Sequence, residues 1–474
     1  MTRHVTSIRR GAAVFAAVTL FTFSAMAQPG GSPGPALTGA AGSSGPRSAA
    51  PSAPSATPAA AGETVALVGA TVHPMSAPAV AGATIVVRDG RVASVGRGAP
   101  PAGARVVNLG GKHVYPGYVL ANSILGLTEI AAVDMTNDYA ETGRLNANIR
   151  AEVAVNPDSE LIPVARVNGV TSAQVVPRGG AIAGTSGLLR LDGWTWEDMT
   201  RRTPLGLHVY WPRMTVSRAW WETRSEEDQK KEREEAIKAI GRAFGDARAF
   251  RAAQRVKGQA GVPRHDRDLQ WEAMTRAIDG EVPVFVHASS LAQIRAALTF
   301  LDEQGVKNAV LVDGADAWRV ADELKRRDIS VIAGSTLGTP ARDHEPYDEA
   351  FTLPARLAKA GVRYAIGDDG NASNARNLPY VAAMAVAFGL PREEALKAIT
   401  LYPAQILGVA DLVGSIEPGK AADFVVTDGD PLELTTKVEQ VWIAGRAVPM
   451  DTRHTRLFQK YDAKPRGPKA RARE

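Results

Sequence analysis

Apolar and polar residues alternate near both ends of the chain, which is the pattern of half-buried β-strands. Residues 83–88 and 91–96 each show this period of two, and the Asp89-Gly90 pair between them is typical of a hairpin turn. Residues 415–450 show the same alternation. We therefore expect segments 64–112 and 415–450 to pair into one small composite β-sandwich domain.

The segment between them, 113–414, alternates short apolar runs with helical patterns. Continuous apolar runs are typical of strands in a parallel sheet that is buried on both faces. The expected strands are 113–124, 171–177, 205–210, 282–288, 309–313, 330–335 and 363–368. The expected helices include 289–304, 315–327 and 347–360, with the charged run 222–258 as a long outer helix. Seven or eight such βα units predict an α/β fold, a (β/α)8 TIM-like barrel.

The composition of the first 62 residues differs from that of the rest of the chain. Residues 1–27 read as an export signal peptide, with a positive start, an apolar stretch and the small-x-small cleavage site Ala25-Met26-Ala27. The apolar stretch is too short for a transmembrane anchor, although a retained anchor is the alternative. Residues 28–62 are almost all Ala, Gly, Pro and Ser and are expected to form a disordered linker. The sequence thus predicts an exported protein, periplasmic or secreted.

The cysteine content and the distribution of charge exclude several kinds of site and partner. The chain has no cysteine, so it has neither disulfides nor thiolate metal sites. The net charge of +5 resides in the basic tail 451–474, where five Arg and three Lys face three acids. No stretch interleaves basic and aromatic residues, so we expect no nucleic-acid partner. The tail is expected to be solvated, with contact to an anionic surface as the alternative.

Polar side chains follow several of the expected strands. His287 closes the apolar run 282–287, and Asp369 follows the run 362–368. The carboxyl ends of parallel strands meet at one mouth of a barrel, where a metal hydrolase would hold such residues. His208 either points into the same mouth or packs inside the fold. The glycine-rich segment 178–187 lacks the spacing of a phosphate cradle and is expected to be a lid-like loop.

Several longer motifs resemble a known family. The chain is similar to the amidohydrolase superfamily, and to its imidazolonepropionase-like branch, from about residue 64 to residue 450. The motifs are Pro116-Gly117, Pro283-Val284-Phe285-Val286-His287-Ala288, Ala365-Ile366-Gly367-Asp368-Asp369, Ala398-Ile399-Thr400-Leu401-Tyr402-Pro403-Ala404 and Gly414-Ser415-Ile416-Glu417-Pro418-Gly419-Lys420-Ala421-Ala422-Asp423. The resemblance implies a barrel with a composite β-sandwich, in agreement with the hydrophobic pattern.

The resemblance also implies a metal site with a partly changed set of ligands. Such enzymes carry His-x-His on the first strand, histidines on the fifth and sixth strands, and an aspartate on the eighth that acts as the catalytic base. In this chain the first pair falls on Asn122 and Ile124, and the sixth-strand histidine falls on Asp313. His287 and Asp369 match. The resemblance therefore implies at most a mononuclear site of His287, Asp313 and Asp369, with zinc, manganese or magnesium weakly bound or absent.

Two functions remain open on these grounds. The first is an exported hydrolase that cleaves non-peptide C–N bonds in cyclic or linear amides by metal-activated water. The second is a catalytically inactive member of the same family, in which His287 and Asp313 hydrogen-bond each other or a buried water. It would bind a small molecule near Asn122 and His208, or act as the partner of an active relative. Homo-oligomers and hetero-oligomers with a related amidohydrolase are both compatible with the sequence.

Overall fold

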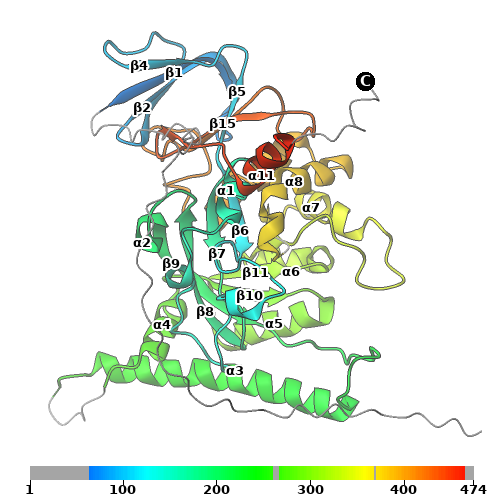
Figure 1. Ribbon diagram of the computed structural model, residues 1–474. Coiled ribbons are helices and arrows are strands. Elements are labelled where there is room, and N and C mark those ends of the chain that lie inside the picture. The colour runs from blue at the N-terminus through cyan, green and yellow to red at the C-terminus, as the bar shows by residue number, and fades with distance from the viewer. Residues whose placement is uncertain (1–62, 260–265, 368–369, 465–474) are drawn as a thin grey trace, which may run out of the picture. The chain divides into compact units, whose positions relative to one another are not determined.

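A computed structural model of the protein describes residues 63–259, 266–367 and 370–464 (Figure 1). The expected signal peptide and linker, residue Asp369 and the end of the basic tail therefore lie outside the described residues. Within the described ranges, no helix is both long enough and apolar enough to cross a membrane.

Strands from both ends of the chain form one eight-stranded sheet, in the order β16-β15-β14-β5-β1-β2-β3, with β4 paired to β1. The antiparallel pair of β14 and β5 joins the two ends, and it places Val425 opposite Tyr115. Ile85, Phe424 and Trp442 belong to its common core. The predicted composite β-domain is thus confirmed. Its strands are β1 (Thr64–Val72), β2 (Val80–Arg88), β3 (Arg91–Gly96), β4 (Arg105–Asn108), β5 (His113–Pro116), β14 (Phe424–Thr427), β15 (Val438–Ile443) and β16 (Arg446–Ala447).

A second eight-stranded sheet forms the barrel, with β6 to β13 in sequence order. A parallel bridge between Ala121 and Gly367 brings its first and last strands together. This arrangement confirms the predicted TIM-like barrel. Its strands are β6 (Tyr118–Ser123), β7 (Val170–Val175), β8 (Ile182–Arg190), β9 (Thr200–Tyr210), β10 (Val284–Ala288), β11 (Ala309–Asp313), β12 (Ser330–Ala333) and β13 (Tyr364–Ile366).

One barrel strand differs from the sequence prediction. β8 runs antiparallel to both β7 and β9, and its first residues come from the glycine-rich segment that was expected to form a lid. The lid prediction is therefore wrong for residues 182–187. The glycines have a packing reason, because a Cβ on Gly184 would lie 2.6 Å from the carbonyl oxygen of Ile149, and one on Gly187 would lie 3.0 Å from the Cβ of Glu152. Glycine in a strand often marks such a close approach.

The expected strand 113–124 is divided between the two sheets. Residues up to Pro116 pair with β14, and the barrel begins at Tyr118, so the domain boundary lies a few residues later than the sequence indicated. Gly117 stands at the crossing point, where a Cβ would lie 2.0 Å from the hydroxyl oxygen of Thr171. Only glycine allows the chain to pass this close to β7.

Helices surround the barrel. The charged run forms α3, whose buried residues Ile240, Ala243, Phe244 and Ala247 make a narrow apolar stripe.

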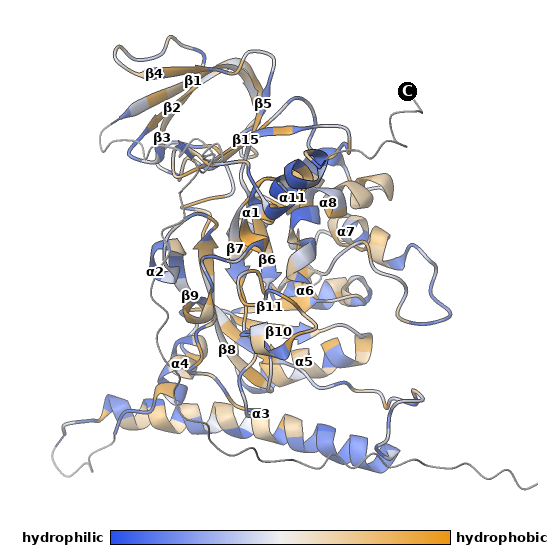
Figure 2. Cartoon of the chain, in the orientation of Figure 1, coloured by the Kyte–Doolittle hydropathy of each residue, from blue (hydrophilic) through white to orange (hydrophobic). Residues whose placement is uncertain are grey.

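Figure 2 shows most barrel strands as hydrophobic and α11 as mainly hydrophilic. α11 lies in the segment expected to be a solvated tail, so part of that tail is helical. The helices are α1 (Leu161–Arg166), α2 (Trp196–Met199), α3 (Glu226–Arg255), α4 (Leu269–Ile278), α5 (Leu291–Glu303), α6 (Ala321–Arg326), α7 (Glu349–Lys359), α8 (Leu378–Ala387), α9 (Arg392–Ala398), α10 (Leu401–Ile406) and α11 (Arg453–Asp462).

Packing inside the barrel gives a first testable prediction, for the substitution Gly206→Ala. A Cβ at this position would lie 2.4 Å from the ring of Phe285, which is fully buried, and 2.6 Å from the carbonyl oxygen of Pro283. Because neither neighbour can move freely, we expect a loss of about 3 kcal/mol in the free energy of unfolding, measured by urea denaturation. Gly245→Ala is the control. Its Cβ would meet nothing within 4 Å on α3, so this change should stabilise the protein by about 0.5–1 kcal/mol. Equal stabilities for the two variants would contradict this packing.

Candidate active site at the barrel mouth

Three polar side chains come from neighbouring parallel strands near their carboxyl ends. His208 lies on β9, His287 on β10, and Asp313 ends β11. The ladder pairs His208 with Phe285, so His208 lies two residues further from the mouth than His287. The structure therefore brings together His208, His287 and Asp313 at the end of the barrel where enzymes of this fold place their chemistry.

The two imidazoles form a direct pair. Nδ1 of His208 lies 2.9 Å from Nε2 of His287, which is a hydrogen-bond distance. Nδ1 of His287 lies 4.0 Å from Oδ2 of Asp313, which is too long for the direct hydrogen bond considered from the sequence. The ring of Tyr210 stacks on His287 at 3.9 Å between centroids, and Phe285 stacks on His208 at 4.8 Å. The orientation of both imidazoles is thus fixed by a hydrogen bond and by stacked rings.

Burial keeps the imidazole pair neutral. His208 is 0% exposed and His287 is 5% exposed. Burial, followed by the positive charge of Arg178, lowers the pKa of His208 to about 3. Burial also lowers the pKa of His287 well below its usual value, with smaller contributions from His208 and Arg178. Burial raises the pKa of the Asp313 carboxyl, although Arg178 opposes this shift. Near pH 7 both rings therefore carry one proton each.

The partners of the rings indicate where those protons lie. Nε2 of His208 is buried and has no hydrogen-bond partner among the described residues. A buried N–H without an acceptor is rarer than a bare acceptor atom, so we assign the His208 proton to Nδ1, which donates to Nε2 of His287. The proton of His287 then lies on Nδ1, on the side of Asp313. An N–H donor and a carboxyl group consequently face a gap that a ligand or a water can bridge.

Arg178 adds a positive charge to the mouth. Nη1 of its guanidinium donates a hydrogen bond of 3.3 Å to the carbonyl oxygen of Gly370, and its charge acts on the imidazoles and on Asp313. Within the described ranges it forms no ion pair with a carboxylate. Arg178 is not among the site residues expected from the sequence, because it begins the glycine-rich segment that is expected there to form a lid. The position of Arg178 directly after the apolar strand 171–177 is the feature of the sequence that could have indicated it.

Asn122 and Asp313 share an uncommon backbone conformation. Their φ angles are +58° and +73°, in the left-handed region that non-glycine residues rarely adopt. Asn122 is the penultimate residue of β6. Its backbone N–H donates to the side chain of Gln174 at 3.0 Å, and its Oδ1 is buried without a partner among the described residues. Ile124 is buried in the hydrophobic core. Such conformations cluster at functional sites, which supports a role for the end of β6 and the end of β11. The proposed role of Asp369 stays a prediction.

The described donors do not fit a resident metal ion. With its proton on Nδ1, and with Nε2 engaged by His208, His287 has no free lone pair to offer. Asp313 is then the only nearby anionic ligand among the described residues, whereas catalytic zinc takes three protein ligands. In the described ranges, no group of three His, Cys, Asp or Glu side chains is arranged to hold a metal. The charge of Arg178 further disfavours a cation at this place.

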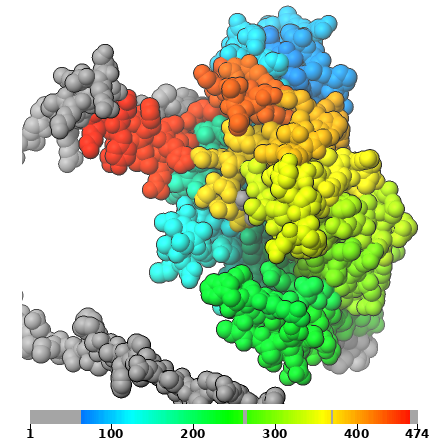
Figure 3. Space-filling model, turned by 90° about the vertical axis from the view of Figure 1, so that its right-hand side faces the viewer, coloured from blue at the N-terminus to red at the C-terminus, as the bar shows by residue number. Residues whose placement is uncertain are grey.

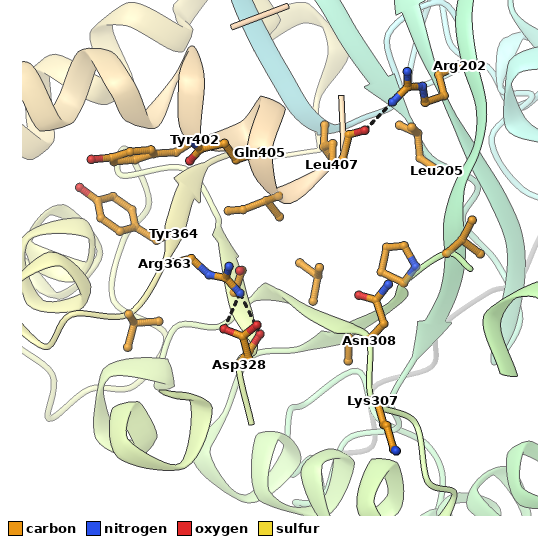
Figure 4. A pocket seen from close by; sticks show the side chains of 18 of the residues that line it. Arg202, Leu205, Lys307, Asn308, Asp328, Arg363, Tyr364, Tyr402, Gln405 and Leu407 are labelled. Carbon is orange, nitrogen blue, oxygen red and sulfur yellow. Dashed lines mark hydrogen bonds and ion pairs between the residues drawn. The ribbon is translucent and has the colours of Figure 1, made fainter. Parts of the chain in front are cut away.

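A large cavity of about 1150 Å³ lies at the opposite end of the barrel (Figure 4). It is lined by residues at the starts of strands, such as Ala309, Ser330 and Tyr364. Arg363 and Asp328, which both line this cavity, form an ion pair of 2.7 Å. Barrel enzymes place their chemistry at the carboxyl ends of the strands, so this cavity is not the candidate active site.

Comparisons with curated proteins find short regions of similarity. The chain is 29% identical to an amidohydrolase of Hapsidospora irregularis over 238 residues, which are 44% of this chain and 23% of that protein. It is 42% identical to the imidazolonepropionase of Porphyromonas gingivalis over 86 residues, which are 16% of this chain and 20% of that protein. The match thus spans about a fifth of the length of these relatives.

Solved structures match over a longer range. An amidohydrolase from Thermotoga maritima superimposes with a TM-score of 0.73 at 28% identity, covering 81% of this chain and 99% of that chain. A prolidase solved with N-methylphosphonate-L-proline matches at a TM-score of 0.50 and 18% identity, again over 81% of this chain and 99% of its own, which shows a likeness in fold alone. The model of the amidohydrolase family matches residues 195–448, more than half of the chain. The chain therefore belongs to the amidohydrolase family.

Proposed function

We propose that the barrel mouth binds a small polar molecule and that its hydrogen-bonded groups have taken the place of a tightly held metal. The observation that supports this proposal most directly is the hydrogen bond of 2.9 Å between His208 and His287. With His208 as the donor, this bond leaves the proton of His287 on Nδ1, the nitrogen that faces Asp313 and would otherwise hold a metal ion. The mouth then presents the N–H of His287, the carboxyl group of Asp313 and the guanidinium of Arg178. These groups suit a ligand that carries an amide or a carboxylate.

A second candidate function is hydrolysis of a C–N bond in a small amide with the help of a weakly held zinc, manganese or magnesium ion. Membership of the amidohydrolase family and the likeness to the amidohydrolase from Thermotoga maritima favour it. It requires the opposite proton assignment, in which Nε2 of His287 donates to His208 and leaves Nδ1 free. Nδ1 of His287 and Oδ2 of Asp313, at 4.0 Å, are then close enough for both to contact one ion at about 2.0–2.2 Å each.

Metal content and turnover separate these two functions. We expect the protein, purified without a chelator, to hold much less than one zinc per chain and to hydrolyse none of a panel of cyclic and linear amides, with or without added zinc. We also expect at least one amide or carboxylate from the same panel to raise the melting temperature, because a ligand at 100 times its Kd stabilises the folded state by about 2.7 kcal/mol.

Single substitutions test the mouth itself. The stabilisation by ligand should disappear in Arg178→Gln and Asp313→Asn, and it should persist in His344→Gln, which changes an exposed loop residue. Stoichiometric zinc, or zinc-dependent amide hydrolysis that is lost in Asp313→Asn, would establish the second function in place of the first.

We further propose that the protein is exported to the periplasm or secreted, as residues 1–27 indicate, and that residues 28–62 tether the folded part. Sequencing the N-terminus of the mature protein tests export, since cleavage after Ala27 is expected. A second copy of the chain or a related amidohydrolase is the proposed protein partner, and the mass of the purified protein in solution tests this.

A further inference from the structure

The C-terminal helix α11 exposes an apolar face that no other described residue covers. Leu457, Phe458 and Tyr461 are 37%, 71% and 63% exposed, and none of the residues of this ten-residue helix is buried. Figure 3 shows α11, in red, standing out from the body of the barrel. Isolated helices shorter than about 12–15 residues are marginal in water, and most helices gain stability by packing an apolar face. A surface that covers this face would therefore stabilise α11.

The polar side of α11 is strongly basic. At about 100° per residue, the three apolar side chains share one side of the helix with His454, and Arg453 and Lys460 lie next to them. From Arg453 to Glu474 the sequence holds five Arg and three Lys against two acids. Arg453 forms no ion pair within the described residues. The surface that meets α11 must consequently be apolar and negatively charged at once.

Few contacts of α11 would be lost on such a surface. Thr452 and Thr455 form a capping box at the start of the helix. Arg456 forms ion pairs of 2.6 Å with Glu160 and 3.3 Å with Asp451, which attach the first turns to the rest of the molecule. His454 also lies 3.3 Å from Arg376, and Lys460 lies over the ring of Tyr461 on the helix itself. Leu457, Phe458 and Tyr461 remain exposed beside these contacts.

We propose that α11 binds an anionic phospholipid surface. A helix that lies in a membrane interface places its apolar side chains among the acyl chains and its cations among the head groups. Lys and Arg near an anionic leaflet contribute about 1 kcal/mol each, so the charge of this segment complements such a surface. A stable protein interface needs roughly 1,000 Å² or more of buried surface, which three apolar side chains do not supply. Lipid is therefore the favoured occupant.

Sedimentation with vesicles tests this proposal on the full chain. We expect the protein to bind phosphatidylcholine vesicles that contain phosphatidylglycerol and not vesicles of phosphatidylcholine alone. Raising the salt to about 0.5 M should release most of it, because salt screens the attraction. The double variant Phe458→Ser/Tyr461→Ser should bind at least roughly tenfold more weakly, because it loses two large apolar contacts.

Two further variants make the test decisive. Trp194→Ser removes an aromatic side chain that is 90% exposed elsewhere on the molecule, so it should bind like the unchanged protein. Removal of residues 465–474 should weaken binding without abolishing it. Equal sedimentation with both kinds of vesicle, or none with anionic vesicles, overturns the proposal, even if α11 then captures a protein. It is also overturned if Phe458→Ser/Tyr461→Ser binds normally while the truncated chain does not bind.

Discussion

Lowering the pH from 6.5 to 5 is expected to reduce the free energy of unfolding by about 3 kcal/mol through His208 and His287 alone. Their pKa values are lowered in the folded protein, by burial first and by Arg178 as a further cause. In the unfolded chain both rings titrate near pH 6.5. Below that pH the unfolded chain therefore binds up to two more protons than the folded protein, and stability falls by up to about 1.4 kcal/mol per pH unit for each ring.

The direction of this pH effect on stability follows from the sign of the pKa shifts. The stability that the neutral pair contributes is fully present above pH 6.5 and is lost as the pH falls toward the lowered pKa values. The raised pKa of Asp313 acts in the opposite direction, because protonation of a carboxyl whose pKa is raised stabilises the folded protein as the pH falls. Urea denaturation at several pH values gives the slope directly.

Matched variants test whether the change of stability with pH comes from His208 and His287. His208→Gln/His287→Gln removes both titrating rings, so its stability should vary little between pH 6.5 and 5 apart from the contribution of other groups. His344→Gln should retain the slope of the unchanged protein, because His344 is exposed. If the double variant shows the same slope as the unchanged protein, then the two rings are not held neutral in the folded state.

The sequence predicts the fold well because its strongest signals are local. Continuous apolar runs reveal the parallel strands, and the alternating runs at both termini reveal the composite sheet. β8 was missed because its glycines read as a loop, whereas the structure uses them to bring Ile149 and Glu152 close to the strand. α11 was missed because its charges dominate its composition. Its helix depends on the capping box of Thr452 and on ion pairs of Arg456.

The candidate site could be predicted only in part. Strand ends indicate His287 and Asp313, because a polar residue after an apolar run has a clear position in a parallel barrel. The pairing of His208 with His287 depends on the register between β9 and β10, which a single sequence does not contain. The burial that keeps both rings neutral, and the approach of Arg178, are equally properties of the assembled barrel.

Introducing the family's first-strand histidines tests whether the end of β6 can take part in a metal site. In Asn122→His/Ile124→His, zinc affinity measured by competition with a chromophoric chelator should rise on the order of 10- to 100-fold. This is the range by which even an outer partner of a metal ligand changes affinity. The two new histidines and Asp313 would then offer three nitrogen and oxygen ligands without any contribution from His287.

The structure sets limits on this gain. Ile124 is 5% exposed within the hydrophobic core, so the new histidine should lower the stability of the apo protein. Arg178→Gln, added to the double variant, should raise zinc affinity further because it removes a positive charge from the mouth. Asn122→Gln/Ile124→Leu is the matched control and should bind no more zinc than the unchanged protein. If the histidine pair binds no more zinc than this control, the end of β6 does not have the geometry of a metal-binding strand.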